Sequence, residues 1–231
     1  FIFLVLLLFL LYAVLILYYR AGWLHLKEYQ LDRNYIPKTK VSIIIPARNE
    51  EQHIRTILKD ITSQYYPSEL IEIIVVDDHS DDQTASMAKA FSEVKLISLS
   101  DFTEGQKLNA YKKKAIEIAI QQSSGELIIT TDADCRMCNY WLLSIVQFYE
   151  TYNHKLIAAP VIFSSDKSWF QTFQSIDFMT MQGITGALAF TKTGTMCNGA
   201  NLAYTRNAFN AVEGFKGIDD IASGDDMLLM Y

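Results

Sequence analysis

The chain has 231 residues and half of them are hydrophobic, which is enough for one sizeable core, or for one domain together with a membrane element. Its formal net charge is −6, and it has no dense run of Lys or Arg. Nucleic-acid-binding proteins usually carry a basic stripe, so no nucleic-acid partner is expected. The cysteines are read as reduced thiols of a cytosolic domain: Cys135, Cys138 and Cys197. A zinc site would need a second cysteine pair or histidines at ligand spacing, and the histidines are scattered.

The first 19 residues carry no charge and, at about 1.5 Å per residue, nearly span a bilayer core. A cleaved signal peptide would need a basic start, a shorter apolar stretch and a small-residue cleavage site, and none is visible. We therefore predict a transmembrane helix over 1–20 and a polar juxtamembrane linker over 21–40. By the positive-inside bias, the basic residues that follow the span place this side in the cytoplasm of the cell (inner) membrane: Arg20, Lys27, Arg33, Lys38 and Lys40.

Both ends of the chain are expected to be cut. The first residue is Phe1 and not Met, and the last, Tyr231, lies inside the apolar run MLLMY. The predicted catalytic domain, 41–231, is therefore expected to be truncated at its C-terminus.

After the linker, stretches typical of strands and helices alternate. Buried strands are predicted at 41–45, 71–76, 94–99, 126–131 and 156–163, and helices at 51–63, 83–91, 107–122 and 140–152. This alternation predicts an α/β fold with a mostly parallel sheet and helices on both faces. Ligands of such sheets bind beyond the carboxyl ends of the strands.

Residues 168–190 are rich in aromatic and apolar side chains. Two interpretations are equally supported: an amphipathic helix at the membrane surface, or a core helix of the second half of the domain.

Polar or acidic clusters follow three of the predicted strands: PARNE (46–50), DDHSDD (77–82) and TDADC (131–135). A further acidic cluster, GDD, occupies 224–226. Each alone could be a turn or a helix cap. Together at one edge of a sheet, the carboxylates would repel one another unless a cation lay among them, and hard divalent cations prefer oxygen ligands.

The spacing within the DxD motif at 132–134 is informative. Carboxylates at i and i+2 of an extended segment point the same way, so Asp132 and Asp134 face one pocket while Ala133 turns away. We predict that Asp134 binds the metal directly. Asp132 is expected to contact the sugar, the ribose or a metal-bound water.

The ordered set of PARNE, VVDDHSDD, KKKAI, ITTDADC and GDD resembles family 2 of glycosyltransferases, from about Val41 to Met230. That family has the GT-A fold, which is Rossmann-like, and includes cellulose, chitin and hyaluronan synthases and dolichyl-phosphate sugar synthases. The resemblance implies a nucleotide-binding half, 41–135, and an acceptor half, 136–231. It also implies a nucleotide-diphospho-sugar donor, a lipid or glycan acceptor, and Mg²⁺ or Mn²⁺.

The resemblance also assigns roles to individual residues. Asp78 matches a residue that hydrogen-bonds the base, commonly uracil, and Lys112 matches a lysine near the diphosphate, with the register among Lys112, Lys113 and Lys114 open. From the residues alone, this lysine trio could equally be a solvated helix face. The residues of the loop near the nucleoside are matched by Pro46, Ala47 and Glu50.

On the acceptor side, CNGANLAYTRNAF (197–209) resembles a family segment in which Gly199 and Ala200 would let a sugar approach the backbone, although NGAN is also turn-like. Asp226 aligns with the catalytic aspartate of the family, and Asp225 replaces a more usual glutamate. The expected activity is an inverting, metal-dependent hexosyl transfer that serves cell-envelope polysaccharide or lipid. The alternatives are a sugar-1-phosphate nucleotidyltransferase and a non-catalytic subunit of a membrane polysaccharide assembly complex.

Overall fold

The computed structural model describes residues 1–103, 109–163, 168–191 and 196–230. The first two residues of the helix predicted from 107, and Tyr231, lie outside these ranges. The chain divides into two compact units: 1–30 with 160–197, and 31–159 with 198–231. Each unit is described by itself.

The first unit consists of helices α1 (Ile2–His25) and α7 (Trp169–Phe190). Helix α1 is the one described helix that is long and apolar enough to cross a membrane, with a mean hydropathy of 2.8. It continues through the first residues of the expected linker, as far as His25. It packs against α7 through small residues, because a Cβ atom on Gly22 would lie 2.8 Å from the carbonyl oxygen of Ala187. Ala187 is the one buried residue of α7. The placement of helix α7 at a membrane surface stays a prediction.

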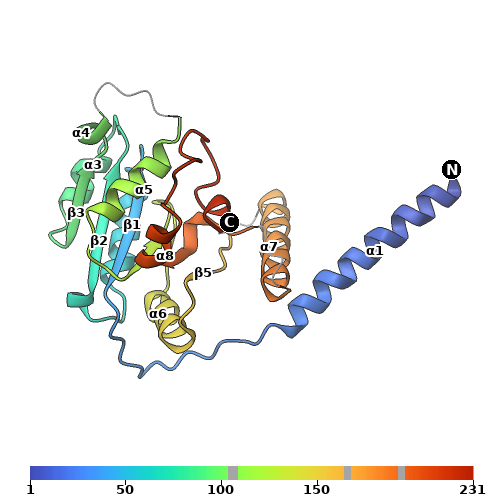
Figure 1. Cartoon of the computed structure of the whole chain (residues 1–231). Helices are drawn as coiled ribbons and strands as arrows, with labels where there is room; N and C mark the ends of the chain where they lie inside the picture. Colours follow the sequence, from blue (N-terminus) through green and yellow to red (C-terminus); the bar gives the residue numbers. More distant parts are fainter. Residues whose placement is uncertain (104–108, 164–167, 192–195, 231) are drawn as a thin grey trace. The chain divides into compact units, whose positions relative to one another are not determined.

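The second unit is built on a six-stranded sheet with the order β3-β2-β1-β4-β6-β5 (Figure 1). The strands are β1 (Val41–Ala47), β2 (Ile71–Asp77), β3 (Val94–Ser98), β4 (Leu127–Thr130), β5 (Leu156–Ala158) and β6 (Leu202–Thr205). Strands β1 to β4 pair in parallel, whereas β6 pairs antiparallel with both β4 and β5. The predicted α/β class with a mostly parallel sheet is confirmed.

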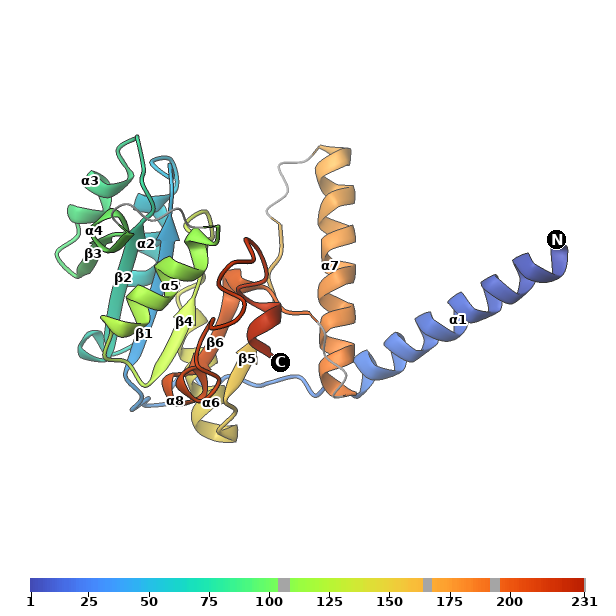
Figure 2. The ribbon, with the colours of Figure 1, turned by 45° about the horizontal axis from the view of Figure 1, so that its top comes forward.

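Alternate side chains of the central strands build two layers of core. Val41, Ile43 and Ile45 of β1 pack on one face of the sheet. They form a cluster with α2 (Ile54–Thr62), α3 (Thr84–Lys89) and α6 (Trp141–Tyr152). Helix α5 (Tyr111–Gln121) lies against β1 and β2, on the face opposite α2 (Figure 2). The helices of this unit are α2 (Ile54–Thr62), α3 (Thr84–Lys89), α4 (Ser100–Thr103), α5 (Tyr111–Gln121), α6 (Trp141–Tyr152) and α8 (Arg206–Ala211), with short 3₁₀ helices at Ser68–Leu70, Gly199–Asn201 and Met227–Met230.

Two features of the sheet differ from the prediction. The strand predicted over 156–163 ends at Ala158, because Pro160 has no N–H to continue a ladder. Strand β6 was not predicted: it has only four residues, and its antiparallel partners β4 and β5 lie far away in the chain.

The second part of the predicted linker, from Leu31, is attached to the sheet domain. The Glu150 carboxylate on α6 accepts hydrogen bonds from the backbone N–H groups of Lys38 and Thr39, both at 2.8 Å, and from the Tyr35 hydroxyl. These bonds outweigh partial burial and lower the pKa of Glu150. The chain therefore enters β1 from a fixed point on α6.

Candidate functional site

The polar clusters meet at one edge of the sheet. Because β1, β2 and β4 run in parallel, the segments after Ala47, Asp77 and Thr130 leave the sheet on the same side. The backbone N–H of Asp78 donates to the carbonyl of Ala47 at 2.8 Å, which joins the first two clusters. Pro46 and Ala47 are the last residues of β1 itself, and Ala47 is buried.

Asp78 is a buried carboxylate beside Arg48 and His79. It is 9% exposed, and its Oδ1 lies 2.8 Å from Nδ1 of His79 while its Oδ2 lies 3.9 Å from Arg48. The His79 ring in turn contacts the Tyr111 ring edge-on, at 5.8 Å between centroids, which ties this loop to the start of α5. Arg48 and His79 lie within the PARNE and DDHSDD clusters, but neither was predicted to be a site residue.

Glu50, Asp132 and Asp134 form an acidic group after β1 and β4. Burial raises the pKa of Glu50, and the negative charges of Asp134 and Asp132 raise it further, against a lowering effect of His53. Ala133 is buried in the core while Asp132 and Asp134 reach the surface. The segment is a turn and not the extended chain that was predicted, since the backbone N–H of Cys135 donates to the carbonyl of Asp132 at 3.2 Å. Among the described residues, no group of three or more His, Cys, Asp or Glu side chains is arranged to hold a metal ion by itself.

Lys112 joins the DxD motif to the GDD motif. Its Nζ lies 2.9 Å from Oδ1 of Asp132 and 3.2 Å from Oδ2 of Asp225. Burial would lower the pKa of Lys112, but the two carboxylates outweigh it and raise the pKa. A residue matched to the nucleotide half and a residue matched to the acceptor half are thus held by one ammonium group.

The three consecutive lysines have three different environments, and this defines their register. Lys112 is the lysine at the acidic edge, whereas Lys114 is at the surface and pairs with Glu117 one turn later, at 2.9 Å. Lys113 is buried. The alternative of a solvated helix face is therefore wrong for Lys113, while Lys112 differs from Lys114 by its two acidic partners and not by its exposure.

Asp226 lies beside the glycine of the NGAN segment. Its Oδ2 accepts a hydrogen bond from the backbone N–H of Gly199 at 2.9 Å, and its Oδ1 accepts one from the N–H of Met227 at 2.6 Å. A carboxylate has about four lone-pair sites, so both oxygens keep capacity for a further donor. A Cβ on Gly199 would lie 3.0 Å from Oδ2 of Asp225, so this glycine lets the protein's own carboxylates approach the backbone.

The NGAN segment is fixed to the sheet at several points. Thr130 at the end of β4 donates to the carbonyl of Gly199 at 3.1 Å, and the Asn198 side chain accepts from the N–H of Ala200 at 2.9 Å. Asn201 accepts from the indole N–H of Trp141 on α6, also at 2.9 Å. These bonds therefore hold the NGAN turn rigidly beside the end of β4, the strand that leads into the DxD motif.

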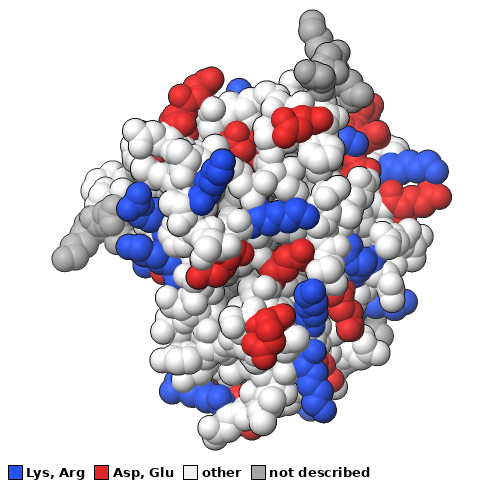
Figure 3. All heavy atoms as spheres, turned by 90° about the vertical axis from the view of Figure 1, so that its left-hand side faces the viewer, with Lys and Arg blue, Asp and Glu red and all other residues white. Residues whose placement is uncertain are grey.

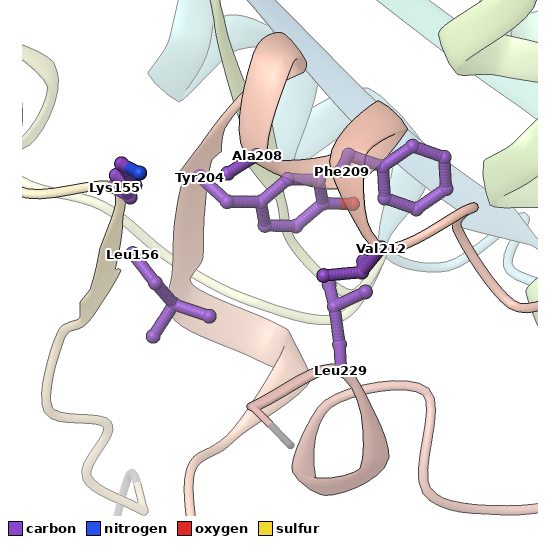
Figure 4. A pocket seen from close by; sticks show the side chains of 7 residues that line it. All are labelled: Lys155, Leu156, Tyr204, Ala208, Phe209, Val212 and Leu229. Atoms are coloured by element: carbon purple, nitrogen blue, oxygen red, sulfur yellow. The ribbon is translucent and has the colours of Figure 1, made fainter.

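A separate apolar cavity of about 180 Å³ lies elsewhere in this unit (Figure 4). It is lined by Lys155, Leu156, Tyr204, Ala208, Phe209, Val212 and Leu229, and by none of the predicted site residues. On the face seen in Figure 3, acidic and basic side chains are interspersed, without a basic stripe.

The two cysteines of the CxxC motif, Cys135 and Cys138, are free thiols. Burial raises the pKa of Cys135, and Asp132 and Asp134 raise it further, against hydrogen bonds that lower it. A reactive thiol needs the opposite shift, so Cys135 has no sign of redox activation.

Comparisons with known proteins identify the family and the fold of the chain. The sequence model of the family described as Glycosyl transferase family 2 matches residues 42–212. The chain belongs to glycosyl transferase family 2. The probable glycosyltransferase YdaM of Bacillus subtilis is 30% identical over 192 residues, which are 81% of this chain and 44% of YdaM. The chain thus spans less than half the length of this family 2 relative.

Solved structures show the same fold. A mannosyltransferase from Pyrobaculum calidifontis, in complex with GDP-Man and Mn²⁺, has a TM-score of 0.65 at 23% identity, covering 89% of this chain and 56% of that one. Glucosyl-3-phosphoglycerate synthase from Mycobacterium tuberculosis, in complex with Mn²⁺, UDP and glucosyl-3-phosphoglycerate, has a TM-score of 0.54 at 17% identity, covering 80% and 64%. At these identities the likeness shows the GT-A fold of the family 2 domain.

Proposed function

We propose that the protein is an inverting glycosyltransferase that moves a sugar from a nucleotide-diphospho-sugar to a lipid-linked or polysaccharide acceptor at the cytoplasmic face of the cell membrane. The observation that supports this most is the cluster in which Lys112 joins Asp132 and Asp225, next to Asp226 on the N–H of Gly199. In this cluster, residues matched to the donor side and to the acceptor side of the family lie next to one another, which supports a transfer between the two substrates there.

The donor is proposed to bind along the ends of β1, β2 and β4. Asp78 would hydrogen-bond the base, with uracil favoured over guanine, while Pro46, Ala47 and Glu50 line the nucleoside. Lys112 would face the diphosphate, because its ammonium group pairs with Asp132 of the DxD motif. The two solved neighbours hold a guanosine or a uridine diphosphate group with Mn²⁺, which supports a nucleotide of this kind.

The residues at the DxD motif suit a Mg²⁺ or Mn²⁺ ion. Such ions are commonly held by one or two carboxylates together with substrate phosphates, so a closed protein cage is not required. Asp134 is exposed, and with Asp132 it adds to the negative charge that raises the pKa of Glu50. When bound, the ion neutralises charge on the departing diphosphate.

Asp226 is proposed as the general base. It would take the proton of the acceptor hydroxyl while that oxygen forms a bond to C1 of the donor sugar. The bond from C1 to the diphosphate breaks on the opposite side, which inverts the anomeric centre. General-base assistance of this kind is typically worth about 10²–10⁴-fold.

The two alternatives fit less well. A sugar-1-phosphate nucleotidyltransferase would be expected to have a glycine-rich loop after β1, where this chain has PARNE. A non-catalytic assembly subunit would be expected to have lost carboxylates that this chain retains at all four clusters.

The test is turnover of donors by the full-length membrane protein. We expect release of a nucleoside diphosphate from one or more members of a panel of UDP- and GDP-sugars in Mn²⁺, and none after chelation. Release of pyrophosphate from a nucleoside triphosphate and a sugar 1-phosphate would instead identify a nucleotidyltransferase. Inertness toward all donors would favour the non-catalytic subunit.

The cytoplasmic orientation has a test of its own. An engineered thiol in the exposed linker, Glu28→Cys, should be protected from a membrane-impermeant thiol reagent in intact cells, since the basic residues after α1 are retained inside. The same thiol should be labelled once the cells are permeabilised. Labelling in intact cells would reverse the proposed topology.

A further inference from the structure

Lys113 lies between Lys112, at the site, and Lys114, at the surface. Its side chain is among the largest fully buried ones of the described residues. It is 2% exposed, although it lies in the first turn of α5. Its Nζ donates to the carbonyl oxygens of Ile218 at 2.8 Å and of Ile221 at 2.9 Å. Within the described ranges, no carboxylate lies at ion-pair distance from this ammonium. A buried ammonium is costly unless its donors are satisfied, so these two carbonyls determine where the side chain can lie.

The carbonyls belong to residues 212–226, which we call the Asp226 loop. The loop is a succession of turns, in which Ile218 N–H donates to Phe215 and Ile221 N–H to Ile218. Gly217 and Gly224 have positive φ angles, of 85° and 80°. A succession of turns lacks the continuous hydrogen-bond ladder of a helix or a strand, so side-chain contacts help to hold the loop in one conformation.

The described structure shows such anchors along the loop. Near its start, the buried Phe215 ring meets the Phe209 ring edge-on, at 5.4 Å between centroids. At its end, Asp225 pairs with Lys112 and Asp226 binds the N–H of Gly199. Lys113 acts between these points, on the two turns that lead into the GDD motif.

We propose that Lys113 is a positioning residue for the transfer reaction. Its ammonium clamps the carbonyls of Ile218 and Ile221 and so keeps Asp226 beside Gly199, while the adjacent Lys112 holds Asp225. Two consecutive residues of one helix thereby fix the base-bearing loop to the domain that binds the donor. The role in turnover rests on the proposed function of Asp226, whereas the clamp itself does not.

The test compares Lys113→Met with Lys114→Met in the full-length protein in detergent. Methionine keeps a long buried side chain but cannot donate, and Lys114 is a matched control because it is the next residue and lies at the surface. Three properties are measured: hydrogen exchange of peptides from the Asp226 loop and from β1 and β2, calorimetric affinity for UDP with Mn²⁺, and turnover.

For Lys113→Met we expect exchange in the Asp226 loop to quicken by about tenfold or more, because two hydrogen bonds to a charged donor are lost. Turnover should fall by roughly 10- to 100-fold, since small misplacements of a catalytic group are costly. Exchange in β1 and β2, and the affinity for UDP, should stay at wild-type values. Lys114→Met should resemble the wild type in all three.

Unchanged exchange in the loop would overturn the clamp, and quicker exchange with undiminished turnover would overturn the positioning role. Equal quickening in β1 and β2 would make Lys113 a general core residue and would also contradict the proposal. If the wild-type chain turned over no donor, the proposed function would fail, while the exchange result would still decide whether Lys113 clamps the loop.

Discussion

Replacing Asp226 with asparagine is expected to lower turnover by about 10²-fold or more, with donor affinity nearly unchanged. The change removes the group that accepts the acceptor proton and nearly preserves the volume of the side chain. An asparagine has one oxygen, so it can keep the bond from Gly199 or the bond from Met227, but not both. The measurement is the initial rate of transfer, together with calorimetry of UDP in Mn²⁺.

Asp219→Asn is the matched control for this variant. Asp219 is exposed and lies in the same loop, so its change removes the same charge without touching Gly199. We expect near-normal turnover for the control. If Asp226→Asn retained near-normal transfer, Asp226 would be structural, and the base would have to be sought at Asp225 or Asp219, or beyond residue 231.

Replacing Asp134 with asparagine should affect an earlier step, the metal-dependent binding of the donor. Asp134 is exposed and its Oδ1 has only a weak contact with the Cys135 thiol, at 4.0 Å, so the fold should tolerate the change. The change removes a negatively charged ligand from the ion, and each 1.4 kcal/mol of binding free energy that is lost lowers the affinity about tenfold. We therefore expect the affinity for UDP in Mn²⁺ to fall by about tenfold or more.

Asp101→Asn provides the comparison for Asp134→Asn. Asp101 is an exposed aspartate on the short helix α4, outside the four clusters, and its change should leave UDP affinity at the wild-type value. If Asp134→Asn bound UDP with the wild-type dependence on Mn²⁺, the metal ligand would have to be another carboxylate of the group, Asp132 or Glu50.

The central strands and the place of the site could be predicted because the signals are local. The runs VSIII and IEIIVV are β-branched and buried, and they lie in β1 and β2 as expected. Since parallel strands end at one edge, the clusters after them had to converge there. Ala133 is buried between two more exposed aspartates, but the prediction that they lie on an extended chain is wrong, because the Cys135 N–H closes a turn on the Asp132 carbonyl.

The second half was harder to predict because its structure depends on distant partners. The four residues of β6 form a strand through pairing with β4, more than seventy residues earlier, and with β5. Four residues show too little periodicity to distinguish a strand from a turn. The strand predicted over 156–163 ends at Ala158 although the apolar run continues, because Pro160 has no N–H to donate to a strand ladder.

The contacts of the three consecutive lysines also could not be predicted from the sequence. Nothing in KKKAI distinguishes a side chain that meets two carboxylates from one that meets two carbonyls. The partners of Lys113 lie 105 and 108 residues away, and they are backbone atoms that carry no residue-type signal. Nor did the sequence show that Asp225 and Asp226 lie against Gly199, and the expected approach of a sugar to this glycine stays a prediction.

One titration tests the separate roles of the two aspartates most directly. UDP is titrated into the full-length wild type, Asp134→Asn and Asp226→Asn, each with Mn²⁺ and after chelation. We predict that Asp226→Asn binds UDP as the wild type does and keeps the dependence on Mn²⁺, and that Asp134→Asn loses most of that dependence. Equal loss in both variants, or no effect of chelation on the wild type, would contradict the division between a metal-binding donor side and a base on the acceptor side.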